Sequence, residues 1–170
     1  RQHLAVTDRK KQFTGLVVEL SDVGLLLPIA AVAEAVRQVS PKPSENQPEW
    51  MYGWLEWREQ TVPMLSFEAF VGGEKLPLPS EANALVVNAI NDIDGKLPFY
   101  ALLVPELPRT IILDEEDELT NMANISAAHS SKGNLLRFQF GIQEFVVPNF
   151  EEIEKSCRAK IPELSKQELS

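Results

Sequence analysis

The chain has 170 residues, of which 44% are hydrophobic and 24% charged, as expected for one globular domain with a substantial core. Its formal net charge of −9 opposes binding to phosphate backbones and anionic headgroups, so we expect neither a nucleic-acid partner nor membrane insertion. The single cysteine, Cys157, cannot form an internal disulfide, which favours a reducing, cytoplasmic location.

The first part of the chain has the pattern of short strands and turns. Residues 13–20 are mainly apolar and end at the turn-prone segment 21–24, after which Leu25–Leu27 resumes the apolar run. This pattern predicts an opening hairpin. The next segments are expected to be a brief helical turn, an extended stretch and a proline-rich loop, over residues 28–34, 35–39 and 40–48.

All three tryptophans, Trp50, Trp54 and Trp57, fall within eight residues. Their spacing alone fits a helix, but Gly53 and the turn-like residues 58–60 argue against one. We therefore expect a turn near 48–51, a strand over 53–57 and a hairpin into 61–66. Such rings either fill a core or form a protein-binding surface.

The second half repeats the strand pattern. Strands are expected over residues 84–90 and 99–104 (joined by an Asp-Gly turn), over 109–113, and in a hairpin of 135–140 with 145–147. Asn149 followed by Glu152 resembles a capping box, so a last helix should begin there and bury Ile153 and Cys157. Many short strands and one closing helix predict an all-β fold of small barrels or a sandwich.

The sequence carries no recognisable catalytic constellation, so neither a metal site nor a cofactor site is expected. His3 and His129 lie far apart in sequence, and no paired Cys or His spacing suits zinc. Consecutive acids at 114–118 are typical of a solvated loop rather than a catalytic pair. An enzyme that uses this acidic run or Ser130 is the remote alternative; otherwise the chain is expected not to be an enzyme.

Two segments carry a resemblance to a known family. They are LLLPIAAVAEAV at residues 25–36 and PEWMYGWLEWREQTVPMLSF at residues 48–67. Together they resemble the CheW-like domains, the coupling proteins of bacterial chemosensory arrays, and most closely the adaptors of type IV pilus (twitching) systems. The likeness continues more weakly to Phe150, which suggests a domain over residues 12–158 with flexible ends at 1–11 and 159–170.

The resemblance implies two intertwined five-stranded SH3-like β-barrels, with short helices and a C-terminal helix. It also implies a non-enzymatic adaptor, monomeric in solution, that joins a chemoreceptor cytoplasmic tip to the regulatory domain of a CheA-like histidine kinase. A groove between the barrels would take the receptor helix, and the opposite barrel would pair with the kinase through small apolar patches. The alternative within the family is a scaffold that binds the kinase alone.

Family positions also suggest a partner-binding set. Glu34 and Arg58 are expected to meet as a semi-buried ion pair between the first helical turn and the hairpin. Trp54 is expected to be an exposed, partner-facing ring, whereas plain core packing is an equal possibility for the valines at positions 32 and 86, and a backbone role is favoured for Gly53. The full set is Val32, Glu34, Gly53, Trp54, Arg58, Val62 and Val86.

The chain departs from the family pattern at two neighbouring positions. Trp57 stands where the family has leucine, so the local packing must differ. Glu59 stands where the family has glycine, so either it adopts a positive φ with some strain or the turn is of another kind.

Overall fold

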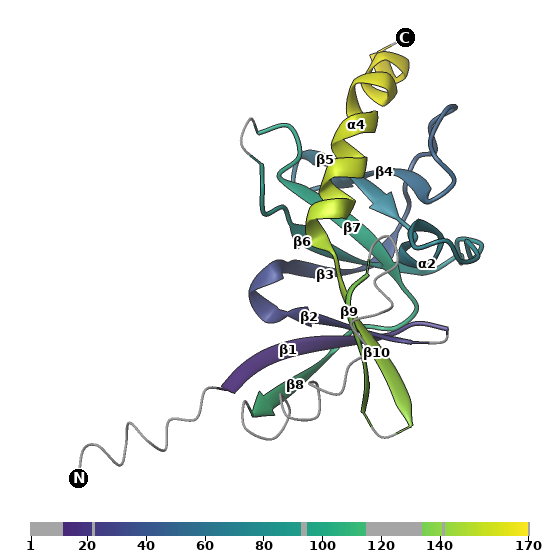
Figure 1. The fold of residues 1–170 in the computed structure, drawn as a ribbon. Coiled ribbons are helices and arrows are strands. Elements are labelled where there is room, and N and C mark those ends of the chain that lie inside the picture. Colours follow the sequence, from purple (N-terminus) through teal and green to yellow (C-terminus); the bar gives the residue numbers. More distant parts are fainter. Residues whose placement is uncertain (1–11, 22, 93–94, 115–133, 141, 170) are drawn as a thin grey trace.

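The computed structural model describes residues 12–21, 23–92, 95–114, 134–140 and 142–169, and it shows a mostly β fold of two five-stranded sheets (Figure 1). The expected all-β class is therefore confirmed. We call the two sheets sheet A and sheet B; in Figure 1 sheet A lies below sheet B.

Sheet A is assembled from the two ends of the chain. Its strands, in the spatial order β8-β1-β2-β10-β9, are β1 (Gln12–Glu19), β2 (Gly24–Pro28), β8 (Arg109–Asp114), β9 (Asn134–Phe140) and β10 (Gln143–Pro148). The hairpins β1–β2 and β9–β10 are antiparallel, as their turn signals predicted. A parallel pairing of β10 with β2 joins the two hairpins.

Sheet B is formed by the continuous middle of the chain. Its strands, in the spatial order β3-β6-β7-β5-β4, are β3 (Val32–Val39), β4 (Met51–Trp57), β5 (Gln60–Leu65), β6 (Ala82–Asn88) and β7 (Phe99–Val104). The predicted hairpin of the tryptophan segment is confirmed by the antiparallel β4–β5 pairing.

Two local expectations need correction. The helical turn predicted over 28–34 is only the 3-10 turn η1 (Ile29–Ala31), because Val32 already pairs with Val87 and continues as β3. A short helix, α2 (Phe67–Phe70), was not predicted; the Ser66 Oγ caps it by accepting the Ala69 N–H at 3.1 Å.

The segment that follows edge strand β3 pairs with β4, the other edge strand, and closes sheet B. After β3 the chain reaches Lys42, which exchanges two backbone hydrogen bonds of 2.8 Å with Trp54 in β4. Gly53 makes this closure possible: a Cβ at Gly53 would lie 2.2 Å from the Lys42 carbonyl oxygen. Its φ of +130° also suits glycine alone.

Sheet B is buried on both faces. Along β6, Leu85 and Val87 face a core shared with sheet A. Ala84 and Val86 face a second core, which the closed sheet B surrounds and which we call the interior of sheet B. This alternation follows from the period of two in a strand and explains the continuously apolar sequence of β6.

The last helix, α4 (Phe150–Leu169), runs from β10 to pack against the shared core (Figure 1). As predicted, the Asn149 Oδ1 accepts the Glu152 N–H at 3.1 Å, and Ile153 and Cys157 are buried. Among the described residues, no helix has the length and apolar character required to cross a membrane.

Candidate partner-binding surfaces

A cluster at one corner of sheet B joins its two edge strands. The Glu34 Oε1, on β3, accepts a hydrogen bond from the Trp57 Nε1 at 2.9 Å and lies 3.1 Å from the Arg58 Nη2. The Arg58 guanidinium also lies over the Trp57 ring, 4.8 Å from its centroid. We call these three residues the Glu34 clamp. The predicted Glu34–Arg58 ion pair is therefore confirmed.

The setting of this pair differs from the expectation in two ways. Glu34 belongs to strand β3 rather than to a helical turn. Only the Glu34 end of the pair is semi-buried, because the Arg58 side chain is 63% exposed and the Glu34 side chain 40%. An exposed ion pair contributes at most about 1 kcal/mol to folding. The rigidity of the corner therefore comes from Trp57, which is buried and packs edge-on against Phe99 at 4.8 Å.

Arg58 is presented on a tight turn. It and Glu59 are the two central residues between the paired Trp57 and Gln60, and their φ angles are +47° and +62°. Two positive φ values define a type I′ hairpin turn, whose twist suits antiparallel strands. Glu59 thus adopts a positive φ, the first of the two alternatives, and a different kind of turn is not needed.

The remaining predicted residues lie mostly inside the protein. Val62 and Val86 are buried in the interior of sheet B, and Val32 is partly buried beside the shared core. Gly53 serves the closure of the sheet. The expectation of an exposed Trp54 ring is wrong: only 9% of Trp54 is exposed, because its ring packs into the core between the sheets.

Sequence reasoning missed the role of Trp57 at this corner and, separately, the exposure of Ile29 in η1. At Trp57 the sequence predicts only a change in local packing, whereas in the structure its indole N–H also donates to the Glu34 carboxylate and holds it in place. Ile29 is 47% exposed, and other large aliphatic side chains of the described residues, such as Ile90 and Ile112, are exposed as well. The apolar sequence around Ile29 gave no signal of this exposure.

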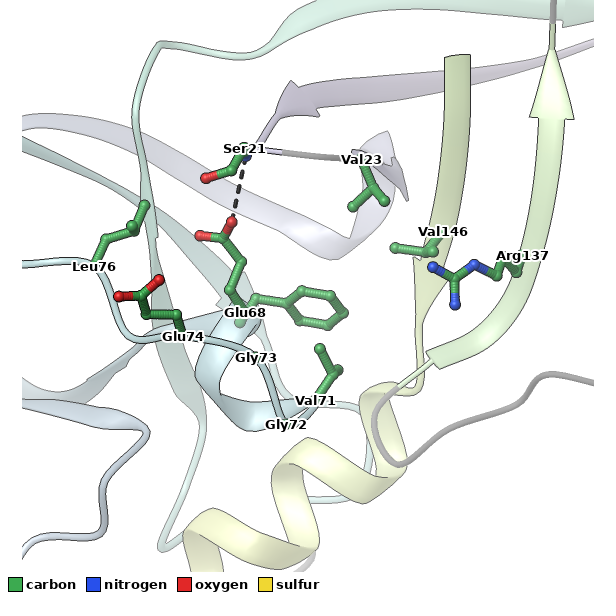
Figure 2. A pocket seen from close by; sticks show the side chains of 11 residues that line it. Ser21, Val23, Glu68, Val71, Gly72, Gly73, Glu74, Leu76, Arg137 and Val146 are labelled. Carbon is green, nitrogen blue, oxygen red and sulfur yellow. Dashed lines mark hydrogen bonds between the residues drawn. The ribbon is translucent and has the colours of Figure 1, made fainter. Parts of the chain in front are cut away.

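A groove lies between elements of the two sheets (Figure 2), and no residue of the Glu34 clamp lines it. It has a volume of about 440 Å³ and is lined by the β1–β2 turn, by α2 and the residues that follow it, and by β9 and β10. Val23, Val71 and Val146 form part of its apolar wall. The Glu68 carboxylate crosses it to accept the Ser21 N–H at 3.3 Å. None of the seven predicted partner-binding residues lines this groove.

The described residues offer no group of three or more His, Cys, Asp or Glu side chains that could hold a metal ion. Burial raises the pKa of the Cys157 thiol and of the Tyr100 hydroxyl, so both groups stay protonated at neutral pH. The acidic run after Asp114, Ser130 and both histidines lie outside the described residues.

These features define a class: an all-β domain of two joined sheets, with a rigid charged corner on one sheet and a separate groove between them. A family model for the CheW-like domain matches residues 14–133. The chain therefore belongs to the CheW-like domain family.

The fold agrees with a solved member of this family. The crystal structure of scaffolding protein TtCheW from Thermoanaerobacter tengcongensis superposes with a TM-score of 0.64 at 16% sequence identity. The match covers 82% of this chain and 90% of TtCheW. Comparison with curated protein sequences gave no match.

Proposed function

We propose that this chain is a non-enzymatic cytoplasmic adaptor that couples a chemoreceptor tip to the regulatory domain of a CheA-like histidine kinase. The observation that carries the proposal is the Glu34 clamp, a charged, preorganised corner within a CheW-like domain. An adaptor needs two separate surfaces on a rigid body, and both sheets offer exposed features.

The receptor surface, in this proposal, is on sheet B. It comprises Glu34, Arg58 and the exposed Ile29 of η1, which we call the receptor face. The apolar side of a receptor helix would contact Ile29, and polar groups beside it would meet Glu34 and Arg58. Because Trp57 holds Glu34 in place, little side-chain entropy is lost when the partner binds.

The kinase surface, in this proposal, is on sheet A. Its edge strand β8 exposes 64% of Ile112, and the β9–β10 turn exposes all of Ile142. In this proposal these two exposed side chains are contact points for a similar barrel in the kinase. The groove of Figure 2 is a second possible seat for the receptor helix. A Val71→Glu variant that kept full receptor affinity would exclude that seat.

The test is titration calorimetry of Arg58→Ala with a receptor-tip fragment and, separately, with the kinase regulatory domain. Receptor affinity should fall by about tenfold, since arginine is enriched among the interface residues whose truncation costs more than about 1 kcal/mol. Arg109→Ala is the matched control, because Arg109 also forms an exposed 3.1 Å ion pair, with Glu19 on sheet A. Equal losses in both variants would contradict the proposed receptor face.

The same titrations decide between the two family alternatives. A chain that binds the kinase domain but no receptor fragment would be a kinase-only scaffold. A receptor fragment from a type IV pilus system, compared with one from a flagellar system, would test the twitching-motility assignment.

A further inference from the structure

A buried carboxylate of the last helix grips the loop that leaves β6. Glu154 in α4 has no exposed surface. Its Oε2 accepts the Ile90 N–H at 2.7 Å, and its Oε1 accepts the Asn91 N–H at 2.9 Å. A buried charge is costly unless it is hydrogen-bonded, and here each oxygen has a donor from the backbone.

One helical turn later, Arg158 completes this grip. Its Nη1 donates to the Asn91 carbonyl oxygen at 3.1 Å, and its Nη2 lies 3.9 Å from the Glu154 Oε1. The helix therefore holds both the N–H and the C=O of Asn91. Attachment of α4 alone does not require this, because Ile153 and Cys157 already anchor the helix in the core.

The gripped loop connects directly to the receptor face. Asn88, the last residue of β6, donates from its Nδ2 to the Ala30 carbonyl oxygen in η1 at 3.3 Å. One residue earlier, Val87 pairs with Val32 of β3. A continuous path of contacts thus runs from Glu154 through Ile90 and Asn88 to η1.

From this path we propose that Glu154 is a positioning residue for the receptor face. Its carboxylate fixes the backbone after β6, and Asn88 then holds η1 in the conformation that presents Ile29. The inference rests on the proposed function, because it assigns Glu154 to the surface that binds the receptor. It predicts that the C-terminal helix affects receptor binding without touching the receptor.

The test compares Glu154→Gln with Glu151→Gln, an equal loss of charge on an exposed residue of the same helix. A glutamine can accept only one of the two N–H groups, because its amide nitrogen is a donor. Amide exchange of Ile90 or Asn91, measured by NMR, should accelerate roughly tenfold. The Leu102 amide in β7 reports global unfolding, and its exchange should change less.

Binding supplies a readout that general destabilisation would not reproduce. Glu154→Gln should lower the affinity for the receptor-tip fragment by roughly tenfold and leave the affinity for the kinase domain unchanged. Asn88→Ala, a milder change at a partly exposed residue, should produce the same selective loss even if Glu154→Gln folds poorly. Because both act through one segment, the double variant should lose little more than either single variant.

Several results would overturn the role of Glu154. Unchanged exchange at Ile90 and Asn91, or equal loss of affinity for both fragments, would reduce it to a packing residue. Unchanged receptor affinity in the Asn88→Ala variant would contradict the proposal that Glu154 acts on η1 through Asn88. If the unsubstituted chain bound neither fragment, the proposed function itself would fail, and the positioning role with it.

Discussion

At the scale of single residues, the three tryptophans have three different surroundings although they are close in sequence. Trp50 packs edge-on against Phe70 of α2, with centroids 5.2 Å apart. Trp54 enters the core between the sheets, and its Nε1 is buried without a hydrogen-bond partner among the described residues. Trp57 packs in the interior of sheet B, and its Nε1 donates a hydrogen bond to the Glu34 carboxylate. Only the last of the three contributes its polar atom to the candidate site.

This difference predicts unequal effects of the same substitution. Trp54→Phe and Trp57→Phe both delete the fused ring from a buried position, but only Trp57→Phe removes a hydrogen bond to a carboxylate. Trp57→Phe should therefore cost about 1–2 kcal/mol more in the free energy of unfolding. Urea unfolding of both variants measures the difference. An equal cost would mean that the Trp57–Glu34 bond adds nothing to stability.

At the scale of elements, the decisive feature is the closure of sheet B between Lys42 and β4. The closure brings together two edge strands and so removes exposed backbone groups that would otherwise invite pairing with other chains. It depends on the absence of a side chain at Gly53. The Glu34 clamp then joins β3 to the end of β4 at a second point.

A comparison of two glycines tests the closure. Gly53→Ala places a Cβ 2.2 Å from the Lys42 carbonyl oxygen and strains a positive φ, so it should cost at least about 3 kcal/mol. Gly72→Ala also strains a positive φ, of +98°, but its Cβ would meet nothing within 4 Å. It should cost only about 1–2 kcal/mol. Similar thermal stabilities for the two variants would argue against steric control of the closure.

At the scale of the whole molecule, helix α4 connects the two sheets. It follows β10 of sheet A, yet its buried side chains pack beside Tyr100 and Leu97 of the sheet B segment. Cys157 lies in this contact, and burial raises the pKa of its thiol well above the ordinary value of 9.0. The thiol consequently reports whether the helix is docked.

The sign of this pKa shift predicts a loss of stability in alkali. Above about pH 9 the unfolded chain loses the Cys157 proton while the folded chain keeps it, so the unfolded state is favoured. The free energy of unfolding should fall by up to about 1.4 kcal/mol per pH unit from this group. The free energy of unfolding of the Cys157→Ala variant, measured by urea titration, should fall less steeply between pH 9 and 10.5. Parallel curves would show that the thiol ionises equally in both states.

Local patterns gave the strands, the hairpins and the capped last helix, because alternation, turn residues and caps act over a few neighbouring positions. The helical turn was predicted to reach residue 34, but it ends at Ala31 because Val32 pairs with Val87, which is distant in sequence, and so begins β3. The Glu34–Arg58 contact came from family resemblance, whereas the buried Trp54 contradicted an expectation drawn from the same segment.

The sequence by itself determined a mostly β domain, because period-two apolar runs and turn residues act over a few neighbouring positions, and the segments 25–36 and 48–67 carried the resemblance to the CheW-like family. Only the tertiary structure decided which side chains reach the surface and which distant groups meet. Sheet closure at Gly53, the fixing of Glu34 by Trp57 and the grip of Glu154 on Ile90 and Asn91 each join residues far apart in the chain. Such contacts depend on packing in three dimensions, which no short window of sequence contains.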